Sequence, residues 1–585
     1  MKKSLLFSAV LAGLMLGSCS SSDDLTGGNT FANQDGKGYV AFNINLPSLS
    51  GSSTRVGSEN DQFDAGMQSE YDVKNATLFL FQGDDEATAT FSKAYALNTS
   101  PWTDKNKTDN VTSTSAKIVQ QVDAPTNKYF ALVVLNHNSV FTLGTGGTVT
   151  VGAENLSGKT LKQFLEMTTP TSGKTLTENG FYMANAPLAS KPGGSTSPTG
   201  ATVNTLVSLD GKVKATETEA SASPADIYVE RGVAKVTMQA STVTEVTGSY
   251  TDAAQTKNVP FVVTSWALDN TNKSTYLVRS TEGFSDWLDL ATKEASVANP
   301  YRFVGSAAVA SNLYRTYFAK DPNFDAAGHA SVTFNQAKDV DYSKEFGDEK
   351  PKYCFENTFD VDNQNDNKTT RVLIKAKLNN GTTFYVLNGN ENLIYTESDV
   401  IKEIQKQFLT EYKQWIKDNV ETPATVNESN VKVSISTDAG TVNIQSITID
   451  GLTLKTTSTE TGLPSDVVAK VTERLGSIKK YKDGESYYFV RIKHFGDDLT
   501  PWENGKLGVG NGKVYPDPDK NDNWLGRYGV LRNNWYDIKV TAVKGLGSAT
   551  VPAVTTDTDD ELKSYIAVQI NVLSWAKRTQ GATLH

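Results

Sequence analysis

The residues best suited to covalent chemistry lie near the start of the chain. A short basic start at residues 1–3 precedes an apolar segment over residues 5–16. That segment has the length of a signal peptide and is too short to cross a bilayer as a helix. It runs into residues 16–19 (LGSC), a small-residue site that ends in a cysteine. This pattern predicts a bacterial lipoprotein signal in which the sulfur of Cys19 is acylated; the alternative is an ordinary signal peptide with a chance cysteine.

A second site for covalent chemistry is the first arginine of the chain, Arg55. Residues 47–56 (PSLSGSSTRV) are mostly small and polar, which predicts an exposed loop. Proteolytic nicking concentrates in loops of this kind. Between Cys19 and Arg55 the chain has no other arginine and one lysine, Lys37. A cut in this loop would separate the preceding segment from the body of the chain.

Two short segments at opposite ends of the chain share one apolar spacing. Side chains that alternate with period two predict a strand with one buried face. Taken singly, each segment fits an ordinary strand of its own domain. Taken together, with Arg55 between the first segment and the body, they favour a subunit in which a strand lost by cleavage is replaced by a neighbour's strand. The alternating apolar residues are Val40, Phe42, Ile44 and Leu46 in the first segment, and Ile566, Val568, Ile570 and Val572 in the second.

Catalytic motifs are weak by comparison. The histidines, at positions 137, 329, 494 and 585, are not spaced for metal binding, and neither HExxH nor G-x-S-x-G occurs. Residues 508–513 (GVGNGK) lack the spacing of a phosphate-binding loop, so a turn is expected. Residues 517–528 begin like a calcium-binding loop but lack its glycine and its closing glutamate. Residues 360–366 are a still weaker candidate for such a loop. We expect no metal and no cofactor, although a glycosidase-type carboxylate pair stays open.

Length and composition bound the class of protein. A chain of 585 residues is expected to form two or more domains. Its net charge of −10 argues against nucleic acid as a partner, because nucleic-acid binding needs a basic footprint. Plentiful Thr, Ser, Asn, Gly and Val with short apolar runs are typical of an all-β extracellular protein. With Cys19 acylated, Cys354 has no partner for an intrachain disulfide.

The periodic patterns place the elements. One long helix is expected where apolar residues recur from Val400 to Ile416, with Thr396 and Asp399 as its N-terminal cap. This helix should bury one face on the second domain. A domain boundary is expected near residues 240–255, where Ser, Thr and Gly accumulate. Further strands are expected at residues 76–82, 129–136, 227–240, 261–268, 371–378, 431–436, 487–494 and 535–543, and short helices at 161–167 and 465–475.

A set of segments, in the same order along nearly the whole chain, resembles the Bacteroidales fimbrillins, specifically the minor-fimbrium (Mfa-type) stalk subunits of type V pili. Residues 20–24 (SSSDD) also resemble the acidic tag that sends Bacteroidota lipoproteins to the outer surface. The matching segments are residues 38–42 (GYVAF), 54–57 (TRVG), 181–185 (FYMAN), 229–235 (VERGVAK), 353–358 (YCFENT), 530–538 (VLRNNWYDI) and 568–575 (VQINVLSW).

The resemblance implies a mainly β fold of two tandem transthyretin-like β-sandwich domains with a few short helices and one longer helix. The implied divisions are a lipoprotein signal peptide (1–19), a propeptide with the removable first strand (20–55), an N-terminal domain (56–245), a C-terminal domain (246–563) and a donor strand (564–585). Export as a lipoprotein is followed by cleavage after Arg55, by an Arg-specific or trypsin-like protease, which leaves Val56 as the new N-terminus.

The implied function is that of a structural, non-enzymatic subunit of a cell-surface fimbria that supports adhesion and biofilm formation. The C-terminal strand, extended through Trp575, would fill the groove that the first strand leaves in another copy. Implied partners are further copies head to tail, anchor and tip subunits, the maturation protease, and host or bacterial surface ligands. The match departs after Trp575, where an acidic, apolar tail is replaced by residues 577–585.

Other functions fit part of the sequence. A surface-anchored glycan-binding lipoprotein with exposed tryptophans would not polymerise, and a secreted hydrolase would use carboxylates that the sequence does not single out. An anchor subunit would keep its lipid, and a tip subunit would lack the donor strand. The lipoprotein signal suits all of these, whereas the paired strands around Arg55 suit only the polymerising subunit.

Overall fold

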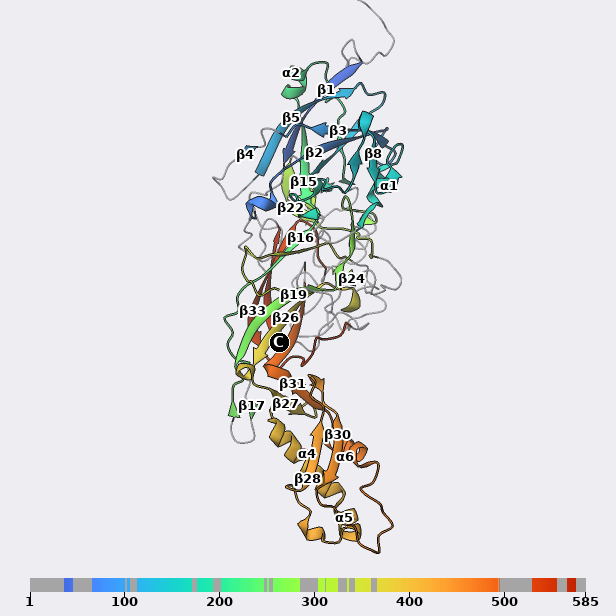
Figure 1. The fold of residues 1–585 in the computed structure, drawn as a ribbon. Helices are drawn as coiled ribbons and strands as arrows, with labels where there is room; N and C mark the ends of the chain where they lie inside the picture. The colour runs from blue at the N-terminus through green and yellow to red at the C-terminus, as the bar shows by residue number, and fades with distance from the viewer. Residues whose placement is uncertain are drawn as a thin grey trace, which may run out of the picture.

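The protein is mainly β and elongated, with two sheet-containing parts and a smaller α/β part arranged end to end (Figure 1). The computed structural model describes residues 36–45, 66–99, 103–105, 113–170, 176–192, 201–246, 250–251, 256–284, 304–310, 312–324, 334–335, 342–358, 366–492, 494, 529–554 and 566–574.

The N-terminal part is built on one large sheet. Apolar side chains of its strands form a single core that includes Val40, Phe42, Leu78 and Ile227. Strands β7 (Thr142–Leu143), β8 (Val149–Val151) and β9 (Glu154–Asn155) form a small separate sheet. The order in the large sheet is β3 (Thr90–Leu97), β2 (Ala76–Gln82), β6 (Tyr129–Leu135), β11 (Met183–Asn185), β15 (Ala225–Arg231), β1 (Lys37–Asn45), β5 (Ser113–Asp123) and β4 (Thr103–Lys105), with β14 (Val207–Ser208) beside β6. The helices of this part are α1 (Leu161–Leu165) and α2 (Glu217–Ala222).

Two further sheets share a second core and form a β-sandwich. Val236, Trp266, Ile374 and Ile538 belong to this core and are almost fully buried. One sheet has the order β25 (Lys352–Cys354), β16 (Ala234–Met238), β33 (Asn534–Val543) and β34 (Ile566–Ser574). The other has the order β19 (Phe261–Asp269), β26 (Arg371–Leu378) and β32 (Glu485–Arg491).

The remaining short strands of these parts form small sheets. The sheet of β12 (Leu188–Ala189), β13 (Val203–Asn204), β22 (Val304–Ala310) and β23 (Leu313–Thr316) joins early and later segments of the chain, and so does the pair of β10 (Thr168–Pro170) with β21 (Ser274–Tyr276). Strand β17 (Tyr250–Thr251) pairs with β18 (Thr256–Lys257), and β20 (Thr271–Asn272) with β24 (Phe334–Asn335).

The expected long helix is present and lies in the α/β part, at the end remote from the N-terminal sheet (Figure 1). Helix α4 (Glu397–Glu411) begins at the predicted capping box, in which Thr396 accepts a hydrogen bond from the amide of Asp399. The helix breaks at Tyr412 and continues as α5 (Lys413–Asn419). One face of the helix is buried in an apolar cluster that it shares with α6 (Val467–Leu475), β28 (Val431–Ile435) and β30 (Ile444–Ile449), within the second domain as expected and separate from the sandwich core. Strands β27 (Phe384–Leu387), β31 (Ile478–Tyr481) and β29 (Gly440–Thr441) complete this part.

The single strand expected over residues 227–240 is two strands in two sheets. β15 ends in the N-terminal sheet, and after Gly232 and Val233 the chain enters the sandwich as β16. A Cβ at Gly232 would lie 3.0 Å from the ring of Tyr182, so the crossing passes very close to the preceding domain. Every residue from 229 to 238 is buried, so no change in burial marks the crossing. The chain therefore passes from the N-terminal sheet to the sandwich at residues 232–233, before the domain boundary expected near residues 240–255.

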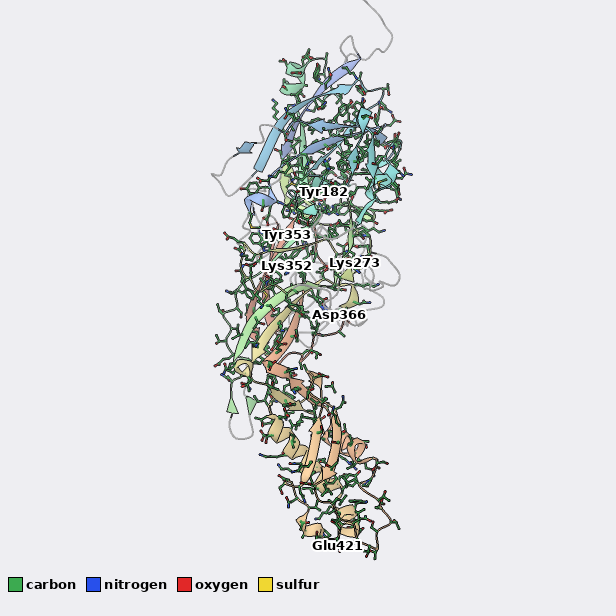
Figure 2. All side chains as sticks on the ribbon, in the orientation of Figure 1. Tyr182, Lys273, Lys352, Tyr353, Asp366 and Glu421 are labelled. Carbon is green, nitrogen blue, oxygen red and sulfur yellow. The ribbon has the colours of Figure 1, made fainter. Side chains whose placement is uncertain are left out.

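Buried ion pairs hold the two sheet-containing parts together at this crossing. Lys235 lies 3.0 Å from Glu70, and Arg279 makes a two-pronged contact with Glu230, with both nitrogen–oxygen distances 2.8 Å. All four side chains are almost completely buried. Tyr353 also donates a hydrogen bond to Glu70, and Figure 2 places Tyr353 between the two parts. Buried charges of this kind are tolerated only when they are paired.

We expect the substitution Glu356→Ala to destabilise this junction strongly. Glu356 is fully buried and accepts a hydrogen bond from Arg532 Nε at 2.9 Å. Removing one member of a buried pair costs about 3–5 kcal/mol because the remaining charge stays buried. Urea denaturation should show the loss. The matched control is Glu345→Ala, whose pair with Lys350 is exposed and should contribute little. Equal effects of the two substitutions would contradict this account of the junction.

Candidate strand-exchange site

Strand β1 is an interior strand of the N-terminal sheet. It runs antiparallel to β5, with Lys37 opposite Asp123 and Asn45 opposite Ser115. On its other side it runs parallel to β15, with Phe42 opposite Ala225. Its removal would therefore leave two strand edges without a ladder partner, and such edges bind added strands.

The apolar face of β1 forms part of the N-terminal core. Val40, Phe42 and Ile44 have no exposed surface, which confirms the strand and the buried face expected there. At 1.5–3 kcal/mol for each fully buried side chain, these three contribute roughly 4.5–9 kcal/mol as an upper estimate. The fourth residue of the pattern, Leu46, lies outside the described residues. Loss of this strand would expose an apolar groove between β5 and β15.

The opposite face of β1 makes polar contacts with its neighbours. Asn43 donates a hydrogen bond of 2.8 Å to Asp226, and the hydroxyl of Tyr39 accepts one of 2.9 Å from Gln121. The ammonium group of Lys37 is paired with Asp123, which also binds Lys93 at 2.8 Å. Hydrogen bonds from Lys37 and Lys93 hold the pKa of the Asp123 carboxyl below its ordinary value.

Strand β34 lies in a different sheet and at its edge. It runs antiparallel to β33 from Ile566, opposite Val543, to Ser574, opposite Asn534. Among the described strands it has one ladder partner, where β1 has two. The structure confirms a strand at each end of the chain, and within one molecule it does not bring the two strands together. For β34 it describes the backbone, which contains Ile566, Val568, Ile570 and Val572.

The remaining sites predicted from the sequence divide into two groups. Cys19, Arg55, Val56, Trp575 and residues 517–523 lie outside the described residues. Three of the side chains considered in the sequence can be placed, His137, Asp366 and His494, and the ring centroids of His137 and Phe141 lie 4.7 Å apart. Asp366 is buried and accepts a hydrogen bond of 2.9 Å from Arg491, which makes it a structural ion-pair residue. The ring of His494 contacts the hydroxyl of Tyr536 at 2.8 Å inside the fold.

The described residues were searched for a metal-binding cluster and for a membrane-spanning helix. No cluster of three or more His, Cys, Asp and Glu side chains there is placed to hold a metal ion. Over the same residues, no helix has the length and apolar character needed to span a bilayer.

Three of the segments that resemble fimbrillin sequences meet at the junction between the two sheet-containing parts. The sequence alone did not indicate this meeting. Glu230, Glu356 and Arg532 come from residues 229–235, 353–358 and 530–538, which are far apart in the chain. The backbone N–H of Asn533 donates a hydrogen bond of 2.8 Å to the backbone carbonyl of Val233. The backbone carbonyl of Asn533 accepts a hydrogen bond of 2.9 Å from the guanidinium of Arg315. The sequence signal that could have indicated this junction is the presence of charged residues, such as Glu230, inside otherwise apolar segments.

Comparison with known proteins assigns the C-terminal region to a family. Residues 479–581 match the family described as "Major fimbrial subunit protein type IV, Fimbrillin, C-terminal", a stretch that includes β32, β33 and β34. No curated protein sequence matches the chain.

Three solved structures are similar at low levels. A proposed cell adhesion protein from Parabacteroides distasonis has 10% identity and a TM-score of 0.33, with 93% of this chain and 99% of that chain covered. A proposed cell adhesion protein from Bacteroides eggerthii has 12% identity and a TM-score of 0.32, with coverage of 95% and 100%. A fimbrial assembly protein from Parabacteroides distasonis has 10% identity and a TM-score of 0.23, with coverage of 57% and 95%. TM-scores this low do not establish fold or function. The match over residues 479–581 shows that the C-terminal part of the chain is similar to this fimbrillin family.

Proposed function

We propose that this chain is a fimbrillin and that it serves as a stalk subunit, which polymerises by exchange of a strand between copies. It is exported as a lipoprotein acylated at Cys19 and is cleaved after Arg55 by an Arg-specific or trypsin-like protease. Cleavage releases the lipid anchor together with β1, and the C-terminal strand of another subunit fills the groove between β5 and β15. The filament supports adhesion and biofilm formation, and anchor and tip subunits end it.

The position of the two strands in their sheets supports the proposal most strongly. In the groove a strand makes backbone ladders on both sides, whereas on β33 the strand β34 makes one. Transfer from the edge of one subunit to the groove of the next therefore gains a ladder, and it also covers the apolar face that Phe42 and its neighbours leave. Burial of four donor side chains is worth roughly 6–12 kcal/mol before ordering costs.

The head-to-tail direction of this contact accounts for growth into a fibre. The acceptor groove lies in the N-terminal sheet and the donor in the C-terminal sheet, so each subunit presents two different surfaces. Contacts between unlike surfaces propagate instead of closing into a symmetric pair. Slow release of the inserted strand would then give the filament kinetic stability.

Three of the eight tryptophans lie in the described part of the chain and bear on the alternative of glycan binding. Sugar stacking requires exposed aromatic rings. Among the described residues, Trp266 and Trp535 are buried and Trp415 is half-buried.

The N-terminal sequence of protein extracted from the cell surface tests the proposed maturation. A chain that begins at Val56 is expected, because the lipid anchor and β1 must both leave before the groove opens. The other possible result, a blocked N-terminus at an acylated Cys19, would support a lipoprotein that stays anchored and does not polymerise.

A further inference from the structure

The residues of β1 recur position by position near the end of the chain. Residues 37–46 read KGYVAFNINL, and residues 563–572 read KSYIAVQINV. Five of the ten positions are identical, namely Lys, Tyr, Ala, Ile and Asn, and three more exchange Val for Ile, Asn for Gln and Leu for Val. Shared strand periodicity would explain a likeness of the apolar positions alone. The likeness also covers the polar face, which periodicity does not explain.

The shared polar positions are those at which β1 contacts its neighbours. Lys37 is paired with Asp123, the hydroxyl of Tyr39 accepts a hydrogen bond from Gln121, and Asn43 donates one to Asp226. In the C-terminal segment the corresponding residues are Lys563, Tyr565 and Gln569. Each offers the same kind of group, an ammonium, a phenol hydroxyl or a carboxamide.

We propose that the donor strand enters the groove in the direction that β1 had, with Lys563 at the position of Lys37. This inference rests on the proposed exchange of strands and fixes its geometry. The donor then runs parallel to β15 and antiparallel to β5 of the accepting subunit. Lys563 meets Asp123, Tyr565 meets Gln121, and Gln569 meets Asp226.

The groove distinguishes this register from its alternatives. A slip by one residue would turn the apolar side chains to the polar face. A slip by two keeps the apolar face in the core but moves Lys563 away from Asp123. In a strand of reversed direction, Lys563 would lie toward Ser115, at the other end of β5. Of these arrangements, the proposed one satisfies all three polar contacts together.

A substitution on the apolar face of the donor strand tests the proposed register, because it should stabilise the filament. Phe42 is fully buried, and its counterpart in the donor is the smaller Val568. The groove has already held a phenyl ring at this place. In the proposed register, Val568→Phe should therefore raise the temperature at which detergent dissociates the filament, because the ring fills space that valine leaves.

Disulfide trapping tests the register directly. Directly opposed residues in an antiparallel pair have Cα atoms about 4.5–5.5 Å apart, within reach of a disulfide. Because Asn43 lies opposite Lys117 and Tyr39 opposite Gln121, the full-length double variants are Lys117→Cys with Gln569→Cys and Gln121→Cys with Tyr565→Cys. The control is Val119→Cys with Gln569→Cys, which reports a slip of two residues. The native Cys354 is buried.

Filaments of each variant are oxidised, boiled in detergent and run without reductant. We expect covalent ladders from both in-register variants and background levels from the control, with all ladders lost on reduction. Ladders from the control alone, or from the Gln569 pair without the Tyr565 pair, in filaments that still form would overturn the register or the direction. A lowered dissociation temperature for Val568→Phe would also contradict the proposed position of that residue. Failure of the cleaved wild-type protein to form filaments would instead refute the proposed function.

Discussion

Replacement of Arg55 by alanine is expected to abolish filament formation. Arg55 is the arginine between Cys19 and the first described residue of the body, Gly66. Without cleavage β1 stays covalently attached, and its high local concentration lets it reoccupy the groove faster than a strand from another molecule can enter. The uncut chain should keep its lipid and run as a monomer on unboiled gels, while wild-type protein runs as a ladder.

The matched variant is Arg55→Lys, which separates the two classes of protease. A trypsin-like enzyme should still cut and allow filaments, whereas an Arg-specific enzyme should not. Lys37 does not offer an equivalent site, because it lies within the β1 ladder and is paired with Asp123. Ladders from Arg55→Ala that are as abundant as those of the wild type would show that cleavage at this residue is not the switch.

Deletion of residues 564–585 is expected to give cleaved monomers that still fold. Among the described strands, β34 lies at the edge of its sheet with β33 as its ladder partner, and β33 keeps its pairing with β16 when β34 is absent. The core residues Val236, Trp266 and Ile538 belong to other strands. Size-exclusion chromatography should show monomers, and circular dichroism should show a cooperative thermal transition close to that of the wild type.

A shorter deletion serves as the control for this result. Removing residues 576–585 leaves intact the ten residues that resemble β1, so this variant should polymerise. If the longer deletion still gave ladders on unboiled gels, the C-terminal strand would not be the donor. An unfolded product would mean that β34 belongs to the permanent core of the sandwich.

Local patterns in the sequence predicted the individual elements well. The strands expected at residues 76–82 and 371–378 have those bounds as β2 and β26, and the cap of α4 lies at Thr396 as expected. In each case the signal is local, either alternation of apolar residues or a side chain that bonds an amide three positions on. The alternation of Val40, Phe42 and Ile44 also indicated the buried face of β1.

What the sequence did not reveal depends on contacts between distant segments. Whether β1 is an interior or an edge strand is decided by β5 and β15, and no pattern within residues 37–46 carries that information. The crossing at Gly232 was hidden because residues 229–238 are buried on both sides of it, so neither flanking segment shows the exposed positions that would mark a boundary. The pair of Glu356 and Arg532 likewise joins residues far apart in the chain, and their charges taken singly indicate surface positions.

A structure of the purified filament tests the central claim most directly. The measurement is the identity of the strand that lies between β5 and β15 in each subunit. We expect residues 563–572 of a neighbouring copy there, with Lys563 beside Asp123 and no density for residues 37–46. Residues 37–46 of the same chain in that position would contradict strand exchange.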